Sequence, residues 1–491
     1  MQLSLGWIDF LLIGPALSLF AFSIVPLAVK VLRGNVEQNS FATLCYGYMG
    51  IISAAGFLIA TAGLKQTAFE NALVFDGISS IAGIIVLLMT TITLTYARDN
   101  YSTNTRQFSE FVFLTLNCAV GMLTFIWSND LIITFVGLEL MSLCLYVLIA
   151  MSSEDKFSKE AAFKYFVLGS FASAIMLYGI SFIYGSAGST FLPDLKNVGA
   201  SLISTNRLFL MGFVMLVVGT CFKISIFPFH AWAPDVYQGS PTPVTGFMAT
   251  GVKAATLAFF LRIMASQTLL AERAWPIVDV LQWLAALTIL VGNVGAVRQT
   301  SLKRMLAYSS VAHSGYLMIG LIAAGVGGEN LVGASGVMFY IFAYALMTMG
   351  AFGVLSLLET HEDHDVTFDD IRGLASDRPI VALAMTVLLL SLGGVPPTIG
   401  FFGKFFLFSA AVKQGFWWLA LWGVIGSVIS VYYYLRPVVA MYMQESVADQ
   451  PMMDRPMSQF VVVLMAVLVV GFGIFSEPFF QMFIQSVAPV F

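Results

Sequence analysis

The sequence from Arg207 to Arg262 reads RLFLMGFVMLVVGTCFKISIFPFHAWAPDVYQGSPTPVTGFMATGVKAATLAFFLR. Its first apolar run is long enough to enter a membrane and carries Lys223, and a second run, after a turn rich in proline and glycine, carries Lys253. A lysine at the centre of a membrane helix costs about 2.5–3.5 kcal/mol on insertion scales. Two lysines beside a proline-interrupted helix therefore indicate a functional site inside the membrane.

The composition excludes a soluble globular protein. Of the 491 residues, 59% are hydrophobic and 10% are charged, whereas soluble domains carry about 25% charged residues. The 23 basic and 27 acidic residues leave a net charge of −4 and form no basic domain that would bind nucleic acid. We predict an all-α polytopic membrane protein whose four separated cysteines are small buried apolar residues rather than metal ligands.

Apolar runs of sufficient length predict about fourteen transmembrane helices in a single membrane domain. The first run lacks a basic leader and is long enough to stay in the membrane as a helix rather than to be a cleaved signal. The predicted spans cover residues 8–32, 41–61, 73–97, 109–127, 130–151, 160–184, 207–233, 240–264, 276–297, 301–325, 331–358, 379–411, 416–440 and 458–487.

The distribution of Lys and Arg between the loops predicts the orientation. If both termini lie on the outer side, the inner loops hold about twice as many basic residues as the outer loops, and Lys303 is counted among the inner ones. This bias predicts that both termini lie outside.

Two of the predicted spans are interrupted near their middle, and five spans separate them. Pro228 interrupts the seventh span, and Gly393-Gly394-Val395-Pro396-Pro397 interrupts the twelfth. Paired interrupted helices are typical of transporters built from internal repeats. We infer two repeats, spans 4–8 and spans 9–13, which are inverted because each holds an odd number of helices. The chain then divides into an N-terminal three-helix part, two repeats and a C-terminal helix, at residues 1–97, 109–264, 276–440 and 458–487.

Glu139 is the one carboxylate deep within a predicted span, roughly 14 Å beyond Asp130 at helical rise. Ser142 is its only polar neighbour in sequence, so a partner must come from another helix. Glu139 is either a structural partner that locks one lysine or a charge whose distance from a lysine changes.

Four lysines lie within predicted spans, and each has a structural alternative. Lys223, Lys253 and Lys404 lie beside or beyond an interruption, so we interpret them as members of a hydrated polar interior. Lys164 is near the end of its span, where snorkelling to the headgroups explains it as well as function does.

The histidines carry two interpretations each. His313 is surrounded by serines and a tyrosine in mid-span, and His230 lies beside the first interruption, so each is either a proton relay or a satisfied core residue. His361 and His364 lie in an acidic loop whose spacing is unspecific for a metal, and a solvated loop or subunit contact is the default interpretation. The aromatic groups Trp417-Trp418 and Tyr432–Tyr434 are interpreted as interfacial or packing residues.

These charges are sufficient for proton transfer. Burial disfavours the charged form of a lysine, and a carboxylate that approaches to about 4 Å restores it by about 4 kcal/mol at an effective dielectric of 20. Moving Glu139 relative to Lys223 would then load or unload a proton, and a row with Lys164, Lys253, His313 and Lys404 would carry it on. The chain has no Walker loop, dinucleotide fingerprint or redox ligand set, so a partner or an ion gradient must supply the energy.

Three stretches resemble a known family: FKISIFPFHAWAPDVYQGSPTPV (222–244), SLKRMLAYSSVAHSGYL (301–317) and GVPPTIGFFGKF (394–405). They are similar to the antiporter-like membrane subunits of bacterial NADH-quinone oxidoreductase, respiratory complex I, and to its subunit N family in particular. The resemblance covers essentially the whole chain. It implies that Glu139, Lys164, Lys223, Lys253 and Lys404 are proton-channel residues and that His230 and His313 are polar positions near them.

The resemblance also implies partners and cofactors. NADH, FMN, iron–sulfur clusters and quinone would be bound by partner subunits and none by this chain, which would pump protons in the bacterial inner membrane beside other membrane subunits, with its termini in the periplasm. A lysine at position 404, where subunit M has a glutamate, and the absence of the long C-terminal extension of subunit L favour subunit N. The alternative is a subunit of a multi-subunit sodium/proton antiporter, which shares the fold.

Overall fold

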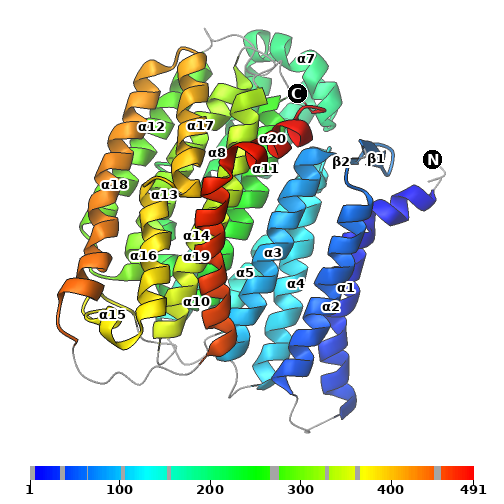
Figure 1. Ribbon diagram of the computed structural model, residues 1–491. Helices are drawn as coiled ribbons and strands as arrows, with labels where there is room; N and C mark the ends of the chain where they lie inside the picture. Colours follow the sequence, from blue (N-terminus) through cyan, green and yellow to red (C-terminus); the bar gives the residue numbers. More distant parts are fainter. Residues whose placement is uncertain are drawn as a thin grey trace.

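The computed structural model describes residues 6–33, 39–63, 65–100, 105–151, 156–265, 276–326, 331–359, 365–446 and 455–490. Long helices run roughly parallel from one end of the bundle to the other, and both termini lie toward the same end (Figure 1). Within the described ranges, twelve helices are long and apolar enough to cross a membrane. The prediction of an all-α polytopic membrane protein is confirmed.

The helices follow the predicted apolar runs closely through most of the chain. Their bounds are α1 (Trp7–Arg33), α2 (Ser40–Ala60), α3 (Gly77–Asn100), α4 (Thr105–Trp127), α5 (Leu131–Ala150), α6 (Lys156–Ala187), α7 (Leu192–Thr205), α8 (Arg207–Lys223), α9 (Trp232–Gly239), α10 (Thr242–Phe247), α11 (Lys253–Ala265), α12 (Pro276–Val297), α13 (Leu302–Gly325), α14 (Leu331–Leu358), α15 (Leu374–Asp377), α16 (Pro379–Gly393), α17 (Ile399–Lys413), α18 (Trp417–Met443), α19 (Pro456–Ile474) and α20 (Ser476–Val487).

Polar residues set several helix starts. The Asp130 carboxylate accepts hydrogen bonds from the backbone N–H groups of Ile132 and Ile133, which would otherwise be unpaired in the first turn of α5. Asn206 caps α8 in the same way, and the Ser301 hydroxyl caps α13. These caps fix the register of the helices that carry the buried charges.

Three predicted connections or spans differ from the structure. The predicted third span begins with strand β2 (Leu73–Phe75), which pairs antiparallel with β1 (Gln66–Ala68), because the turn between them includes Phe69, Glu70 and Asn71 at positive φ. The connection 185–206 holds the amphipathic helix α7, started by Pro193 at its first turn.

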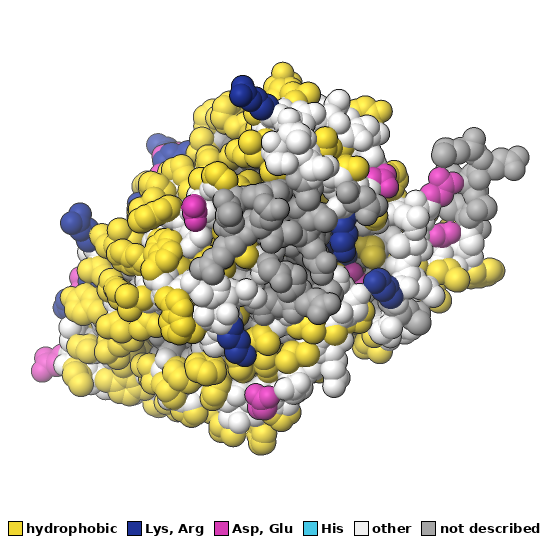
Figure 2. All heavy atoms as spheres, turned by 90° about the horizontal axis from the view of Figure 1, so that it is seen from above, with side chains coloured by type: hydrophobic (Ala, Val, Ile, Leu, Met, Phe, Trp, Pro, Cys, Tyr) yellow, Lys and Arg dark blue, Asp and Glu magenta, His cyan; other side chains and the backbone are white. Residues whose placement is uncertain are grey.

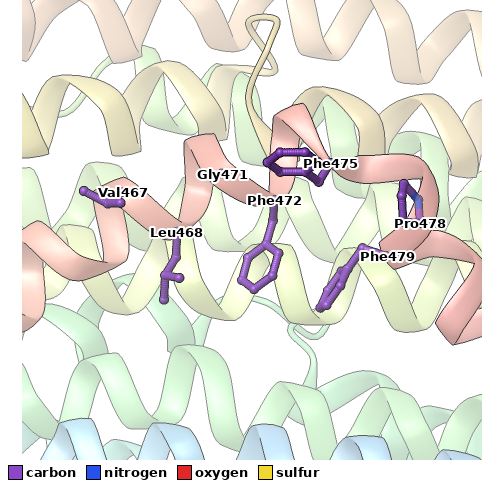
Figure 3. A pocket seen from close by; sticks show the side chains of 7 residues that line it. All are labelled: Val467, Leu468, Gly471, Phe472, Phe475, Pro478 and Phe479. Carbon is purple, nitrogen blue, oxygen red and sulfur yellow. The ribbon is translucent and has the colours of Figure 1, made fainter.

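The C-terminal span expected at 458–487 is also wrong as a single helix, because the chain breaks after Ile474 and restarts as α20 with Pro478 in its first turn. The break opens an apolar groove of about 360 Å³ (Figure 3). It is lined by Val467, Leu468, Gly471, Phe472, Phe475, Pro478 and Phe479.

Both predicted interruptions are present. Within the seventh predicted span, 207–233, α8 ends at Lys223 and the chain turns before α9. Within the twelfth, α16 ends at Gly393, Gly394 has a φ of +85°, and α17 begins at Ile399. A left-handed residue of this kind is favourable only for glycine at a helix C-terminus. Each break leaves a helix end inside the bundle, where the last backbone carbonyls accept hydrogen bonds from outside the helix, such as that from Trp232 to Phe222 and that from Lys404 to Gly393.

The outside of the bundle is largely apolar. Seen from the end that holds α7 and the C-terminus, hydrophobic side chains make up much of the outline, with charged side chains scattered among them (Figure 2). The exposed aromatic side chains of α6 include Phe163 and Phe171, at 67% and 68% exposure. Such a surface suits a hydrocarbon surrounding.

Candidate functional site

Lys223 is the last residue of α8, directly before the first break. Its side chain is buried, and its Nζ donates a hydrogen bond of 2.7 Å to Ser142 Oγ on α5. The ammonium also lies 5.1 Å from the ring centroid of Tyr165 and 5.9 Å from that of Tyr146. A hydroxyl and aromatic faces stabilise the charge without neutralising it, so the lysine is held without a carboxylate in contact.

Glu139 lies one helical turn before Ser142 on α5. It is half-buried at the edge of a helix face on which Val136 and Leu143 are exposed. Its Oε1 is buried and has no hydrogen-bond partner. The Glu139 charge acts on Lys223 electrostatically, yet the two groups form no ion pair among the described residues. The carboxylate is therefore near its expected partner but not locked to it.

Lys253 begins α11, after five residues of π-helix at Met248–Val252. Its buried Nζ donates to both the backbone carbonyl and the hydroxyl of Ser310 on α13, each at 2.5 Å. The Tyr344 hydroxyl donates to the same Ser310 oxygen at 2.9 Å. A π-turn often occurs at functional sites, and here it directly precedes the lysine.

His313 is buried among four tyrosines, Tyr316, Tyr340, Tyr344 and Tyr434. Its Nδ1 is 2.6 Å from the Tyr340 hydroxyl and its Nε2 is 3.1 Å from the Tyr434 hydroxyl, which also bonds Ser309. Both ring nitrogens therefore have hydroxyl partners that donate or accept, and the imidazole can hold either tautomer. This is a satisfied core histidine, and its partners are also groups that can exchange protons.

Lys404 lies on α17 and points back to the second break. Its Nζ donates to the backbone carbonyls of Leu392 and Gly393, at 2.9 and 3.0 Å, and to Ser427 Oγ at 2.9 Å. The two carbonyls are free because α16 ends there. The break thus supplies the acceptors for the buried ammonium.

Rings and hydroxyls connect these positions in a row. The His313 ring is 5.1 Å from the Tyr344 ring, which contacts Ser310 and Lys253, and 5.5 Å from the Tyr316 ring. Tyr316 in turn lies 5.0 Å from Lys404 Nζ. His313 is therefore placed between Lys253 and Lys404.

A second series of rings leads from Lys223 toward Lys253. Tyr165, beside Lys223, is 4.7 Å from Trp232, and Trp232 is 6.0 Å from Tyr237. The Tyr237 side chain interacts with Ser310, the partner of Lys253. The three buried lysines and His313 thus lie along one continuous series of polar and aromatic contacts.

Lys164 lies apart from this row. Its side chain is 41% exposed and pairs with Glu160 at 2.7 Å and with Asp235 at 2.9 Å. Asp235, on α9, also pairs with Arg304 at 2.7 Å. Burial works to raise the pKa of Asp235, but hydrogen bonds from Lys164 and Arg304 outweigh it and hold the pKa below its usual range. Lys164 therefore joins α6 to α9 and α13 through Asp235.

His230 lies in the first break and is half-buried, with its ring 5.6 Å from that of Phe227. In the described part of the chain no hydrogen bond joins it to a buried lysine. The structure brings it near Lys223 in the chain but not into the row. His361 and His364, in the acidic loop, lie outside the described residues.

The sequence did not predict the burial or the partners of several residues of the site. Tyr433 and Tyr434, interpreted from the sequence as interfacial or packing residues, are buried, while Tyr432 is 61% exposed. Lys303, expected in an inner loop, is buried as well and pairs with Glu359 at 2.6 Å. A hydroxyl carries no hydropathy signal, so its role is visible only once its partner is known.

The sequence was compared with known proteins. The family described as NADH:quinone oxidoreductase/Mrp antiporter, TM, matches residues 128–430, which include Glu139, the buried lysines Lys223, Lys253 and Lys404, and His313. NADH-quinone oxidoreductase subunit N of Bdellovibrio bacteriovorus is 51% identical over 98% of this chain and 99% of its own length. The chain belongs to the NADH-quinone oxidoreductase subunit N family.

Solved structures agree with this assignment. A chain of respiratory complex I from Thermus thermophilus is 32% identical, with a TM-score of 0.80, over 95% of this chain and 98% of that one. A chain of the Mrp complex from Dietzia sp. is 18% identical with a TM-score of 0.82, over 97% of both chains, and shows the fold alone. Membership in the subunit N family makes this chain a membrane subunit of an enzyme complex, NADH-quinone oxidoreductase. Among the described residues no cluster of His, Cys, Asp and Glu could hold a metal ion.

Proposed function

We propose that this chain translocates protons as the subunit N of an NADH-quinone oxidoreductase. The observation that carries the proposal is the row Lys223, Lys253, His313 and Lys404, in which buried titratable groups are held by hydroxyls, carbonyls and rings. Groups held in this way can be protonated or neutral without leaving a buried opposite charge unpaired.

Glu139 is the control element in this proposal. Its charge is near Lys223 and out of contact with it, so a small movement changes the stability of the Lys223 ammonium. At an effective dielectric of 20, a carboxylate at about 4 Å contributes roughly 4 kcal/mol, which is enough to load or release a proton. Val136 and Leu143, exposed beside Glu139, place the carboxylate at the edge of the subunit, where a neighbouring membrane subunit would act on it.

The proton then passes along the row. Release from Lys223 toward Lys253 follows the hydroxyls of Tyr165, Tyr237 and Ser310, and transfer from Lys253 to Lys404 passes His313, whose two nitrogens each have a tyrosine hydroxyl as partner. Lys164 supports this path indirectly, by holding α9 through Asp235.

The energy comes from outside the chain. NADH, FMN, iron–sulfur clusters and quinone are assigned to partner subunits, and the neighbours of this chain are other membrane subunits. We assign it to the bacterial inner membrane, with both termini on the periplasmic side and about fourteen crossings in two inverted repeats. The apolar outer surface and the two interrupted helices support this arrangement.

The test is NADH-driven proton uptake by membrane vesicles that contain the assembled complex. We expect Lys223→Ala and Glu139→Gln to abolish or strongly reduce uptake per NADH oxidised. Lys413→Ala is the matched control, since Lys413 is exposed at the end of the helix that carries Lys404. Full uptake in correctly assembled Lys223→Ala vesicles would refute the proposal, and sodium-dependent transport without NADH would favour an antiporter.

A further inference from the structure

The buried pair of Lys303 and Glu359 takes no part in the row described above. Lys303 Nζ is 2.6 Å from Glu359 Oε1, and their side chains are only 3% and 6% exposed. Thr242 Oγ1 donates to the same Glu359 oxygen, and Lys303 also donates to the Ser240 carbonyl at 3.3 Å. Three elements of the bundle, the start of α10, the start of α13 and the end of α14, thus meet at this pair.

The pair lies near the end of the bundle opposite the termini. Ser301, two residues before Lys303, pairs in a β-bridge with Thr367, and the chain then leads to α15 at that end (Figure 1). The Ser301 hydroxyl donates to the half-buried Asp365, whose other carboxylate oxygen accepts a hydrogen bond from Gln238. The half-buried Asp365 and the Ser301 hydroxyl therefore lie at the start of α13, two residues before Lys303.

Lys303 lies on the same face of α13 as Ser310, the residue that accepts the hydrogen bonds of Lys253. Lys303 and Ser310 are seven residues apart on α13, two turns along one face and roughly 10 Å in rise. On α14, Tyr344 and Thr348 lie on one face, at about 100° per residue, and Glu359 follows the end of this helix at Leu358. The Ser310–Tyr344 contact joins α13 to α14, and the Lys303–Glu359 contact joins the start of α13 to the residue after α14. The Thr348 hydroxyl, one turn from Tyr344, is buried on the side of α14 that leads toward Glu359.

The chemistry of this pair differs from that of the other buried pair. Arg262 and Asp76 form a bidentate pair at 2.7 and 3.1 Å, and a guanidinium does not release its proton in a protein. A lysine and a glutamate can instead exchange a proton along their hydrogen bond and become neutral together. The charged group that also faces Glu359 is Arg455, which bonds the Ser356 carbonyl.

We propose that Lys303 and Glu359 are the proton-uptake pair for Lys253, an inference that rests on the proposed proton translocation. A proton from the Asp365 side binds the Glu359 carboxylate, which breaks the ion pair. The Lys303 ammonium then gives its proton, past Thr348 and Ser310, to the neutral Lys253 amine. Transfer of the proton from the Glu359 carboxylic acid to the Lys303 amine restores the pair, so one proton has moved inward and no other reactant is consumed.

The decisive variant is Lys303→Arg in the complete enzyme complex, reconstituted in liposomes. It keeps the positive charge and the pair but cannot release a proton. We expect wild-type assembly and a loss of proton uptake per NADH oxidised equal to that of Lys253→Ala. Full uptake per NADH in Lys303→Arg would overturn the inference and leave the pair as a structural contact.

A second variant covers the case in which the larger guanidinium prevents assembly. The double variant Lys303→Met, Glu359→Gln removes both charges and keeps an acceptor for Thr242, and it is expected to show the same loss, whereas full uptake would again overturn the inference. Arg262→Lys, in the other buried pair, is the control and is expected to keep uptake per assembled complex unchanged. If Lys253→Ala itself keeps full uptake, the proposed function fails rather than this inference alone.

Discussion

The Lys223 ammonium donates a hydrogen bond of 2.7 Å to Ser142 Oγ on α5. Glu139 lies one turn from Ser142 on α5, but its carboxylate is not in contact with Lys223. A neutral hydroxyl therefore occupies the position next to the charge that a carboxylate could take. This arrangement separates the structural anchoring of Lys223, which Ser142 provides, from its electrostatic control, which Glu139 provides. The anchoring can be removed by a substitution of Ser142, and the electrostatic control by a substitution of Glu139.

Removing the hydroxyl of Ser142 tests the anchoring. Ser142→Ala leaves the buried Lys223 ammonium without this acceptor, which costs about 1–3 kcal/mol, so we expect a clear fall in NADH-driven proton uptake. Ser142→Thr keeps the hydroxyl and should keep most of the uptake. Ser173→Ala is the control, since the buried Ser173 hydroxyl has no hydrogen-bond partner. Equal uptake in Ser142→Ala and the wild type would show that this bond does not matter for transport.

Tyr432 and Tyr434, two residues apart on α18, allow a role of the tyrosine hydroxyl in proton transfer to be tested against a matched control. Tyr434 bonds Ser309 and His313, whereas Tyr432 is 61% exposed. We expect Tyr434→Phe to lower proton uptake per NADH, because His313 Nε2 loses its partner at a cost of about 1–3 kcal/mol, and Tyr432→Phe to leave uptake unchanged. The same uptake in both variants, measured at equal complex content, would argue against a role for the Tyr434 hydroxyl.

The second break tolerates no side chain at Gly400. A Cβ there would lie 2.0 Å from the Ser391 carbonyl oxygen, at the end of α16. Overpacking of this kind costs about 1–3 kcal/mol, so Gly400→Ala is expected to lower the amount of assembled subunit in membranes. Gly471→Ala meets no atom within 4 Å and should assemble normally. Normal assembly of Gly400→Ala would mean that the break can rearrange.

The contact between α6, α9 and α13 is stabilised by ion pairs that require the ionised carboxylate of Asp235, so its stability depends on pH. The pKa of Asp235 is lowered, despite burial, by Lys164 and Arg304. A lowered pKa means that the stabilisation is fully present above the unfolded value, about 3.9, and is lost as pH falls below it. Asp235→Asn should therefore lower the Tm of the solubilised complex by the same amount at pH 6 and pH 8. A difference that changes between these pH values would contradict this assignment.

The sequence predicted most helices well because a hydrocarbon core imposes both length and composition on a crossing. It missed α7, because an amphipathic helix is not apolar enough to be recognised as a membrane span. It also missed the break between α19 and α20, because a short kink leaves the apolar run uninterrupted. It also placed Lys303 in a loop, because a position two residues inside a helix start carries no hydropathy signal of burial.

The sequence by itself determined that charged residues lie within apolar spans and that proline and glycine interrupt two of these spans, because both features are local. Only the tertiary structure decided which group each lysine meets. Ser142 is 81 residues from Lys223, and Ser310 is 57 residues from Lys253. A hydroxyl and an ammonium group so far apart in the sequence come into contact only when their helices pack together. The same packing left Glu139 near Lys223 without contact, which is a property of the distance between helices and not of either residue.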